Sequence, residues 1–150
     1  MILLLAFLLP LLSIPFLCLV DRKSKRKPAL IVAVFSMLDL ILLLYITPEV
    51  LFQGKYVESY YWMPMLGAPL TLFADGISLS LAIITLLLII SSIIFAADYM
   101  EKSNSIWQFY AFMALLTVGL VGVFITANLM VFYFCWEFML IPTYFIIGGW

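Results

Sequence analysis

Long hydrophobic runs alternate with short polar segments along the whole chain. Five runs hold at most one charged residue each and reach the roughly 20 residues that a helix needs to cross about 30 Å of hydrocarbon. They cover about 1–20, 28–46, 76–97, 106–126 and 129–150. A backbone inside lipid must satisfy its own hydrogen bonds, and no alternating segments typical of a membrane barrel occur. The pattern therefore predicts an all-α membrane protein with five transmembrane helices.

Composition supports a membrane location and excludes several kinds of function. Of the 150 residues, 67% are hydrophobic and 10% are charged, whereas a soluble domain has about 25% charged residues. The net charge of -1 leaves no basic surface for nucleic acid. The chain has no histidine and two cysteines, too few ligands for a haem or an iron–sulfur cluster. We expect this chain to bind no cofactor or metal and to perform no redox chemistry itself.

The basic residues predict the orientation in the membrane. Five of the seven Lys and Arg residues lie in 22–27, between the first two predicted helices, and such loops stay cytoplasmic. A signal peptide carries its positive charge before the hydrophobic run, so 1–20 is interpreted as a retained helix. The N-terminus and the segment 47–75 are then expected outside, in a plasma or other energy-transducing membrane. Contact of the basic cluster with anionic lipid is compatible with this orientation.

The outer segment 47–75 combines prolines with aromatic residues that favour the headgroup level, namely Pro48, Pro64, Pro69, Tyr56, Tyr60, Tyr61 and Trp62. We interpret it as an irregular interfacial loop. Asp75 stands directly before the third predicted helix, where its side chain can accept hydrogen bonds from unpaired N–H groups. A structural cap is therefore expected at Asp75.

Two ionisable residues, Asp39 and Glu137, lie within predicted helices, where an acid costs about 2.5–3.5 kcal/mol on insertion scales. The only polar neighbour of Asp39 within one preceding turn is Ser36. Asp39 is open to two interpretations: a supporting role in proton transfer, or a protonated carboxyl that packs between helices.

Glu137 has surroundings that favour proton transfer. Pro142 lacks an N–H, so we expect a kink at which the carbonyl of Phe138 loses its helical partner. Tyr133 lies one turn before Glu137 and Tyr144 two turns after it, which places hydroxyl groups on the same face. The alternative is a protonated Glu137 that only joins two helices by hydrogen bonding.

The fifth predicted helix resembles that of the antiporter-like subunit M of the respiratory complex I family, the equivalent of mitochondrial subunit 4. The resemblance rests on residues 128–150, NLMVFYFCWEFMLIPTYFIIGGW, with its Trp-Glu pair and Ile-Pro-x-Tyr-Phe run. Residues 74–79, ADGISL, and 109–111, FYA, are similar to the starts of helices three and four in that family.

The resemblance implies a fold of about fourteen helices with two inverted five-helix repeats, of which this chain matches the first five helices. It implies that Glu137 pairs at mid-membrane with a lysine on helix seven, which has no counterpart here. We therefore expect residues 1–150 to form one transmembrane domain that is a fragment or split part of a longer antiporter-like subunit. Other hydrophobic subunits, membrane lipid and a segment supplying that lysine are the expected partners.

The function that the resemblance implies is proton translocation in the membrane arm of an NADH-, ferredoxin- or F420H2-linked quinone oxidoreductase, an enzyme complex whose redox chemistry occurs elsewhere. Alternatives are a subunit of an Mrp-type cation/proton antiporter, and a subunit of a related membrane-bound hydrogenase or sulfane reductase. A non-catalytic membrane scaffold is an alternative of another class.

Overall fold

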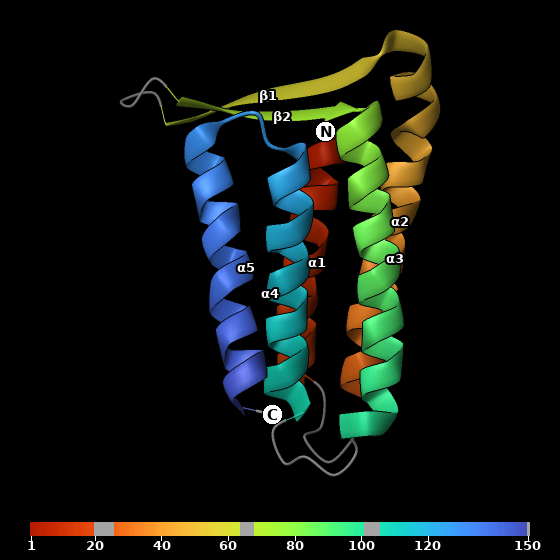
Figure 1. Cartoon of the computed structure of the whole chain (residues 1–150), viewed down its shortest axis with the longest axis vertical. Coiled ribbons are helices and arrows are strands. Elements are labelled where there is room, and N and C mark those ends of the chain that lie inside the picture. The colour runs from red at the N-terminus through yellow and green to blue at the C-terminus, as the bar shows by residue number, and fades with distance from the viewer. Residues whose placement is uncertain (20–25, 64–67, 101–105, 150) are drawn as a thin grey trace.

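The computed structural model describes residues 1–19, 26–63, 68–100 and 106–149. Five helices run up and down beside one another, and a two-stranded hairpin lies across one end of them (Figure 1). The helices are α1 (Ile2–Leu19), α2 (Lys27–Gln53), α3 (Gly76–Tyr99), α4 (Ile106–Ile125) and α5 (Leu129–Gly149). All five are long and hydrophobic enough to cross a membrane. The prediction of a five-helix, all-α membrane protein is confirmed.

The hairpin corrects the prediction for 47–75. Helix α2 continues through Pro48 to Gln53, and the left-handed Gly54 (φ 79°) ends it. Strands β1 (Lys55–Met63) and β2 (Ala68–Asp75) then pair antiparallel, with Lys55 opposite Asp75. The prediction of an irregular loop was wrong because Tyr and Trp, which made the segment look interfacial, are also strong strand formers. Pro64 lies outside the described residues.

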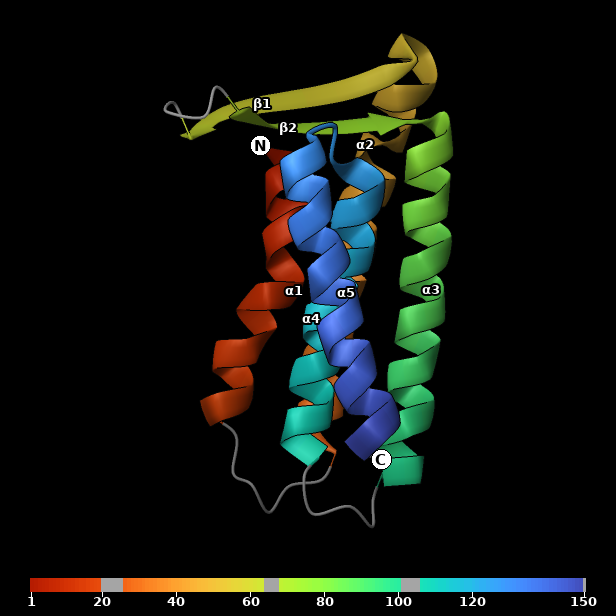
Figure 2. The same cartoon turned by 60° about the vertical axis from the view of Figure 1, so that its left-hand side comes forward.

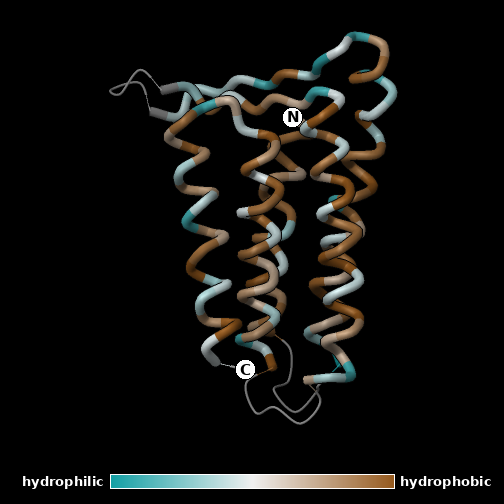
Figure 3. Tube along the Cα trace, viewed as in Figure 1, coloured by the Kyte–Doolittle hydropathy of each residue, from teal (hydrophilic) through white to brown (hydrophobic). Residues whose placement is uncertain are grey.

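The N-terminus lies at the hairpin end and the chain's last residues lie at the opposite end (Figure 2). Hydrophobic residues cover the helices, whereas many hydrophilic residues gather in the hairpin and at the opposite helix ends (Figure 3). At that opposite end Arg26 pairs with Asp98 across 3.4 Å. Most of the basic cluster, Arg22 to Lys25, lies outside the described residues, so the predicted sidedness stays a prediction.

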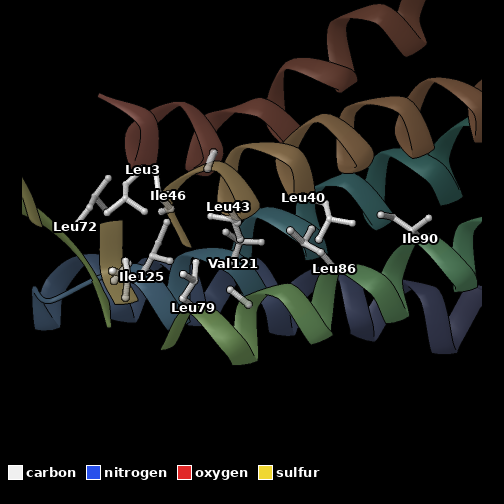
Figure 4. Close-up of a cluster of buried hydrophobic side chains, with 14 residues drawn as sticks. Leu3, Leu40, Leu43, Ile46, Leu72, Leu79, Leu86, Ile90, Val121 and Ile125 are labelled. Carbon is white, nitrogen blue, oxygen red and sulfur yellow. The ribbon is translucent and has the colours of Figure 1, made fainter. Parts of the chain in front are cut away.

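Two hydrophobic clusters form the core. The cluster nearer the hairpin, called here the hairpin-side cluster, contains Leu3 of α1, Leu43 of α2, Leu86 of α3 and Val121 of α4 (Figure 4). The second, the far-side cluster, contains Leu17 of α1, Val32 of α2, Ile93 of α3 and Met113 of α4. Helix α4 contributes to both clusters and also packs against α5. It is therefore the central helix of the bundle.

Asp75 caps α3 as the sequence suggests. Its Oδ1 accepts a hydrogen bond from the Ser78 N–H at 2.7 Å, and its own N–H donates to Ser78 Oγ at 2.9 Å. This reciprocal pair is a capping box, which satisfies two N–H groups at the helix start. The bond from the Ser78 N–H, more than any other contact, lowers the pKa of the Asp75 carboxyl below its usual value.

Candidate functional site

Helix α5 carries Glu137, and its start is attached to the hairpin. Asn128 Oδ1 accepts hydrogen bonds from the N–H groups of Met130 (2.8 Å) and Val131 (3.4 Å), which caps the helix. The Asn128 Nδ2 donates to the Pro69 carbonyl at 2.9 Å. The adjoining Ala127 N–H donates to the Thr71 carbonyl at 2.9 Å. Strand β2 therefore sets the position from which α5 descends.

Helix α4 fixes the middle of α5 through two glycines. A Cβ on Gly119 would lie 2.7–2.8 Å from three α5 backbone atoms: the Met139 nitrogen, the Cys135 oxygen and the Phe138 carbonyl carbon. A Cβ on Gly122 would lie 2.5 Å from Cys135 Sγ. The absence of a side chain at Gly119 lets the two backbones approach directly beside Glu137. This contact sets the depth and direction of the carboxyl-bearing turn.

Glu137 itself is half-buried and lies on a face of α5 that the bundle leaves largely uncovered. Only 17% of the membrane-crossing part of α5 is buried, against 50% for α4. Tyr133, 59% exposed, lies close enough for its hydroxyl to interact with the Glu137 carboxylate. Tyr144 is 75% exposed, and no hydrogen bond among the described residues joins it to Glu137. The structure therefore brings Tyr133, but not Tyr144, to the carboxyl group.

Pro142 lies inside a continuous helix and faces the bundle, where it is buried. The following Thr143 donates its hydroxyl hydrogen to the Met139 carbonyl at 2.7 Å. The helix assignment runs without a break from Leu129 to Gly149, and the expected kink at Pro142 stays a prediction.

The described residues offer Glu137 no cation. All seven Lys and Arg residues of the sequence lie at 22–27, 55 and 102, away from the middle of any helix. No group of three or more potential metal ligands occurs among the described residues. Of the two cysteines, Cys18 is exposed and Cys135 is buried, and both are free thiols. No cationic partner for Glu137 therefore lies within the described part of the chain.

Asp39 lies elsewhere, in the interior of the bundle. Its exposure is 0%, and neither carboxyl oxygen has a hydrogen-bond partner among the described residues. The structure therefore separates the two mid-helix acids: Glu137 faces outward from α5, and Asp39 faces inward from α2.

An apolar groove of about 370 Å³ lies between the hairpin half of α1, the hairpin and α5. It is lined by Leu4, Phe7, Leu8, Trp62, Leu70, Val131, Phe134, Cys135 and Phe138. This lining contains no ionisable side chain except the Cys135 thiol, and Glu137 is not part of it. The groove offers a hydrophobic surface and no acid–base chemistry.

A third acid, Glu58 of β1, forms a polar site that sequence reasoning missed. Its carboxylate accepts hydrogen bonds from the N–H groups of Leu3 and Leu4, both at 3.2 Å, and from the N-terminal ammonium. Tyr56 and Tyr60 donate their hydroxyls to it at 3.1 and 2.9 Å. The strand spacing Tyr56-x-Glu58-x-Tyr60, with all three side chains on one face, is the signal that could have indicated the site.

The environment of Glu58 stabilises its ionised form. Desolvation alone would raise the pKa of Glu58, because the side chain is only 6% exposed. The hydrogen bonds from the N-terminal ammonium, Tyr60 and the first backbone N–H groups of α1 outweigh desolvation. They lower the pKa from 4.5 to about 2. Glu58 thus pins the start of α1, a helix end that favours negative charge, to the hairpin.

Comparison with known proteins gives a consistent set of relatives. The chain is 32% identical over 150 residues to NADH-quinone oxidoreductase subunit M of Pseudomonas aeruginosa, covering 90% of this chain and 28% of that protein. It is 32% identical over 97 residues to F(420)H(2) dehydrogenase subunit M of Methanosarcina mazei, covering 64% of this chain and 19% of that protein. The chain thus spans less than a third of the length of these relatives. No protein-family model matches it.

Two solved structures share the fold. The membrane-bound sulfane sulfur reductase, an archaeal respiratory membrane complex, contains a chain that superimposes with a TM-score of 0.78 at 24% identity. A chain of the Mrp complex from Dietzia sp. superimposes with a TM-score of 0.70, also at 24% identity. Both superpositions cover 97% of this chain, and 23% and 15% of the respective chains. At this identity the likeness establishes the arrangement of the helices.

Proposed function

On the premise that this chain is a homologue of the antiporter-like subunit M of respiratory oxidoreductases, we propose that it translocates protons in the membrane arm of such a complex. In this proposal the oxidoreductase is linked to NADH, ferredoxin or F420H2, and Glu137 is the proton-binding carboxyl. The chain forms part of an enzyme complex while electrons move through other subunits. Its relatives are named as subunits of such oxidoreductases.

The observation that carries the proposal is the position of Glu137. It is an acid in the middle of a membrane helix, on a half-exposed face, with Tyr133 beside it and no cation within the described chain. An ionised carboxyl in hydrocarbon is costly, so an acid there favours either a proton or a cationic partner. A cation that approaches stabilises the carboxylate and releases its proton; when the cation withdraws, the carboxyl takes up a proton again. One charge moved across about 100 mV costs about 2.3 kcal/mol, which a redox-driven movement of the cation has to supply.

The cation belongs to a segment outside the described residues, and we propose that it is a lysine. Tyr133 supports the carboxyl by hydrogen bonding, and Gly119 fixes the α5 backbone beside it. In the proposed orientation, the hairpin and the N-terminus face outside the cell or the equivalent compartment, and the basic segment 22–27 faces the cytoplasm.

The experiment that tests the proposal replaces Glu137 in the assembled complex. Glu137→Gln keeps the volume and the hydrogen-bonding capacity but cannot exchange a proton. At matched abundance of the complex, protons taken up into vesicles per electron transferred should fall several-fold. Glu137→Asp should retain part of the uptake, because its carboxyl is only drawn back by one methylene. Glu49→Gln, on the exposed end of α2, is the matched control and should leave the ratio unchanged.

The scaffold alternative makes the opposite prediction. If Glu137 only joins helices, a neutral glutamine serves nearly as well as a protonated glutamate. Proton uptake at the wild-type ratio in Glu137→Gln would therefore rule out the channel role and leave a scaffold.

A further inference from the structure

On α1, α2 and α4 buried polar residues lie between the two hydrophobic clusters of the core, whereas on α3 the clusters meet at Ile89 and Ile90. In α1 the hairpin-side cluster ends at Ala6 and the far-side cluster includes Leu17. In α2 the clusters break between Val32 and Leu40, and in α4 between Ala114 and Val121. The polar residues in these three gaps are Ser13, Ser36, Asp39 and Thr117, and each has 0% exposure. We call these four residues the polar layer.

The three helices that carry the polar layer, α1, α2 and α4, pack against one another. Ser13 donates its hydroxyl hydrogen to the Pro10 carbonyl at 2.6 Å, and Thr117 donates to the Met113 carbonyl at 2.7 Å. Both hydroxyls therefore use their hydrogens within their own helices and keep lone pairs for other groups. The Ser36 hydroxyl and both Asp39 oxygens have no partner among the described residues. Of the three hydroxyl hydrogens in the layer, those of Ser13 and Thr117 are engaged and that of Ser36 is not.

Among the described residues no positive charge lies beside Asp39, and the N-terminal ammonium of α1 is paired with Glu58 at the hairpin. In the elements packed around α2, the other titratable or charged side chains lie at helix ends, in the hairpin or on exposed surface, Tyr110 apart. They are Cys18 in α1, Arg26, Lys27, Tyr45 and Glu49 in or beside α2, Lys55, Tyr56, Glu58, Tyr60, Tyr61 and Asp75 in the hairpin, and Asp98 and Tyr99 in α3. Tyr110 of α4 is buried, but it lies among the far-side cluster and carries no positive charge.

A carboxylate buried without a cation is strongly unfavourable, and binding a proton removes the charge at once. The proton also gives the carboxyl a donor of its own, since a protonated carboxyl has one O–H. A metal cation would need several ligands turned toward it, and no group of three or more His, Cys, Asp or Glu side chains occurs among the described residues. The layer therefore favours binding of a proton over binding of a metal cation.

The polar layer lies at the depth of Glu137, on the other side of α4. Thr117 belongs to the layer, and Gly119, two residues later and about 3 Å along the axis, contacts α5 at residues 135–139. Helix α4 therefore lies between the polar layer and the α5 backbone that bears Glu137. We infer that Asp39 with the polar layer is a second proton-binding site, distinct from Glu137 and enclosed by α1, α2 and α4. It holds a proton at neutral pH.

Carbodiimide labelling tests this site without measuring transport. A lipid-soluble carbodiimide reacts with protonated carboxyl groups, so membranes that contain the assembled complex are treated at neutral pH and the labelled peptides are mapped by mass spectrometry. Asp39 should be labelled several-fold faster than Glu49, an exposed carboxyl on the same helix at the water-facing end. Labelling of Asp39 should slow as the pH rises and should be unchanged in Glu137→Gln. The result therefore does not depend on whether Glu137 transports protons.

Infrared spectroscopy of the same complex removes the dependence on reagent access. The wild type should have a protonated-carboxyl C=O band that Asp39→Asn loses and Glu49→Gln keeps. Absence of Asp39 labelling together with no band lost in Asp39→Asn would overturn the inference. Sodium ions that slow the labelling at constant pH would also overturn it, because the layer would then be a cation site. Mapping of wild-type peptides remains decisive even if Asp39→Asn fails to assemble.

Discussion

Three acids of this chain have three different environments, and their environments decide what each can do. Glu58 is ionised because ammonium, hydroxyl and backbone N–H groups surround it. Among the described residues, Asp39 has no hydrogen-bond partner in the bundle interior, and the hydroxyl of Tyr133 lies beside Glu137 on an outward face. Residue type and depth alone, which the sequence supplies, marked Asp39 and Glu137 as noteworthy. They did not reveal Glu58, whose partners at the start of α1 lie 54 to 57 residues away in the chain.

The pH dependence of stability should depend on Glu58. Its pKa is about 2 in the folded chain and 4.5 in the reference state, so its ionised form stabilises the fold above about pH 4.5. That stabilisation should be lost as the pH falls from 4.5 toward 2. Glu58→Gln should lower the free energy of unfolding at neutral pH by roughly 1–3 kcal/mol, because charged, buried hydrogen bonds are weakened. Thermal unfolding of the chain in lipid nanodiscs, followed by circular dichroism over this pH range, measures both effects.

Glu49→Gln is the control for Glu58→Gln, since Glu49 is exposed and its one hydrogen bond is to Gln53 at 3.5 Å. It should change the stability little at any pH. Glu58 is expected to attach the start of α1 to the hairpin only while it is ionised. If Glu58→Gln loses stability between pH 4.5 and 2 as steeply as the wild type, this role is contradicted.

At the scale of elements, the positions of the helices could be predicted from the lengths of the hydrophobic runs. The exact ends of the helices depend on the residues found there, such as proline and glycine. The expected spans and the observed helices differ by one or two residues at most ends. The exception is α2, which continues seven residues beyond 46 because Pro48 is accommodated within the helix and Gly54 supplies the left-handed end. The hairpin was not predicted, since its strand pairing is a contact between two segments that were each ambiguous by themselves.

Gly119 should be the least tolerant glycine of α4. Gly119→Ala places a Cβ against backbone atoms of α5. The backbone of a helix cannot move aside as easily as the flexible end of a side chain. We expect a loss of roughly 1–3 kcal/mol in the free energy of unfolding, as for other overpacked contacts. Because α5 must shift at residues 135–139, proton uptake per electron should fall as well. Gly148→Ala is the control: nothing lies within 4 Å of its Cβ, so it should be neutral or slightly stabilising. Equal stability of the two variants would contradict a close α4–α5 contact.

At the scale of the whole molecule, the bundle has a closed side and an open side. Helices α1 to α4 enclose the core, and the hairpin joins α1, α2, α3 and the α4–α5 turn at one end. Helix α5 is attached to this unit by one face and leaves the other uncovered. The hydrophobic pattern could predict that the chain crosses a membrane five times. It could not predict which face of each helix would be buried, since nearly every position is hydrophobic and the amphipathic signal is weak.

We propose that Glu137, on the open side of α5, meets a cation supplied from outside the described part of the chain. The measurement that tests this pairing is a structure of the assembled complex with side chains resolved around α5. We expect a lysine whose Nζ lies within about 4 Å of a Glu137 carboxyl oxygen, or reaches it through one water. Only apolar side chains or lipid tails around Glu137 would show that no such pairing exists.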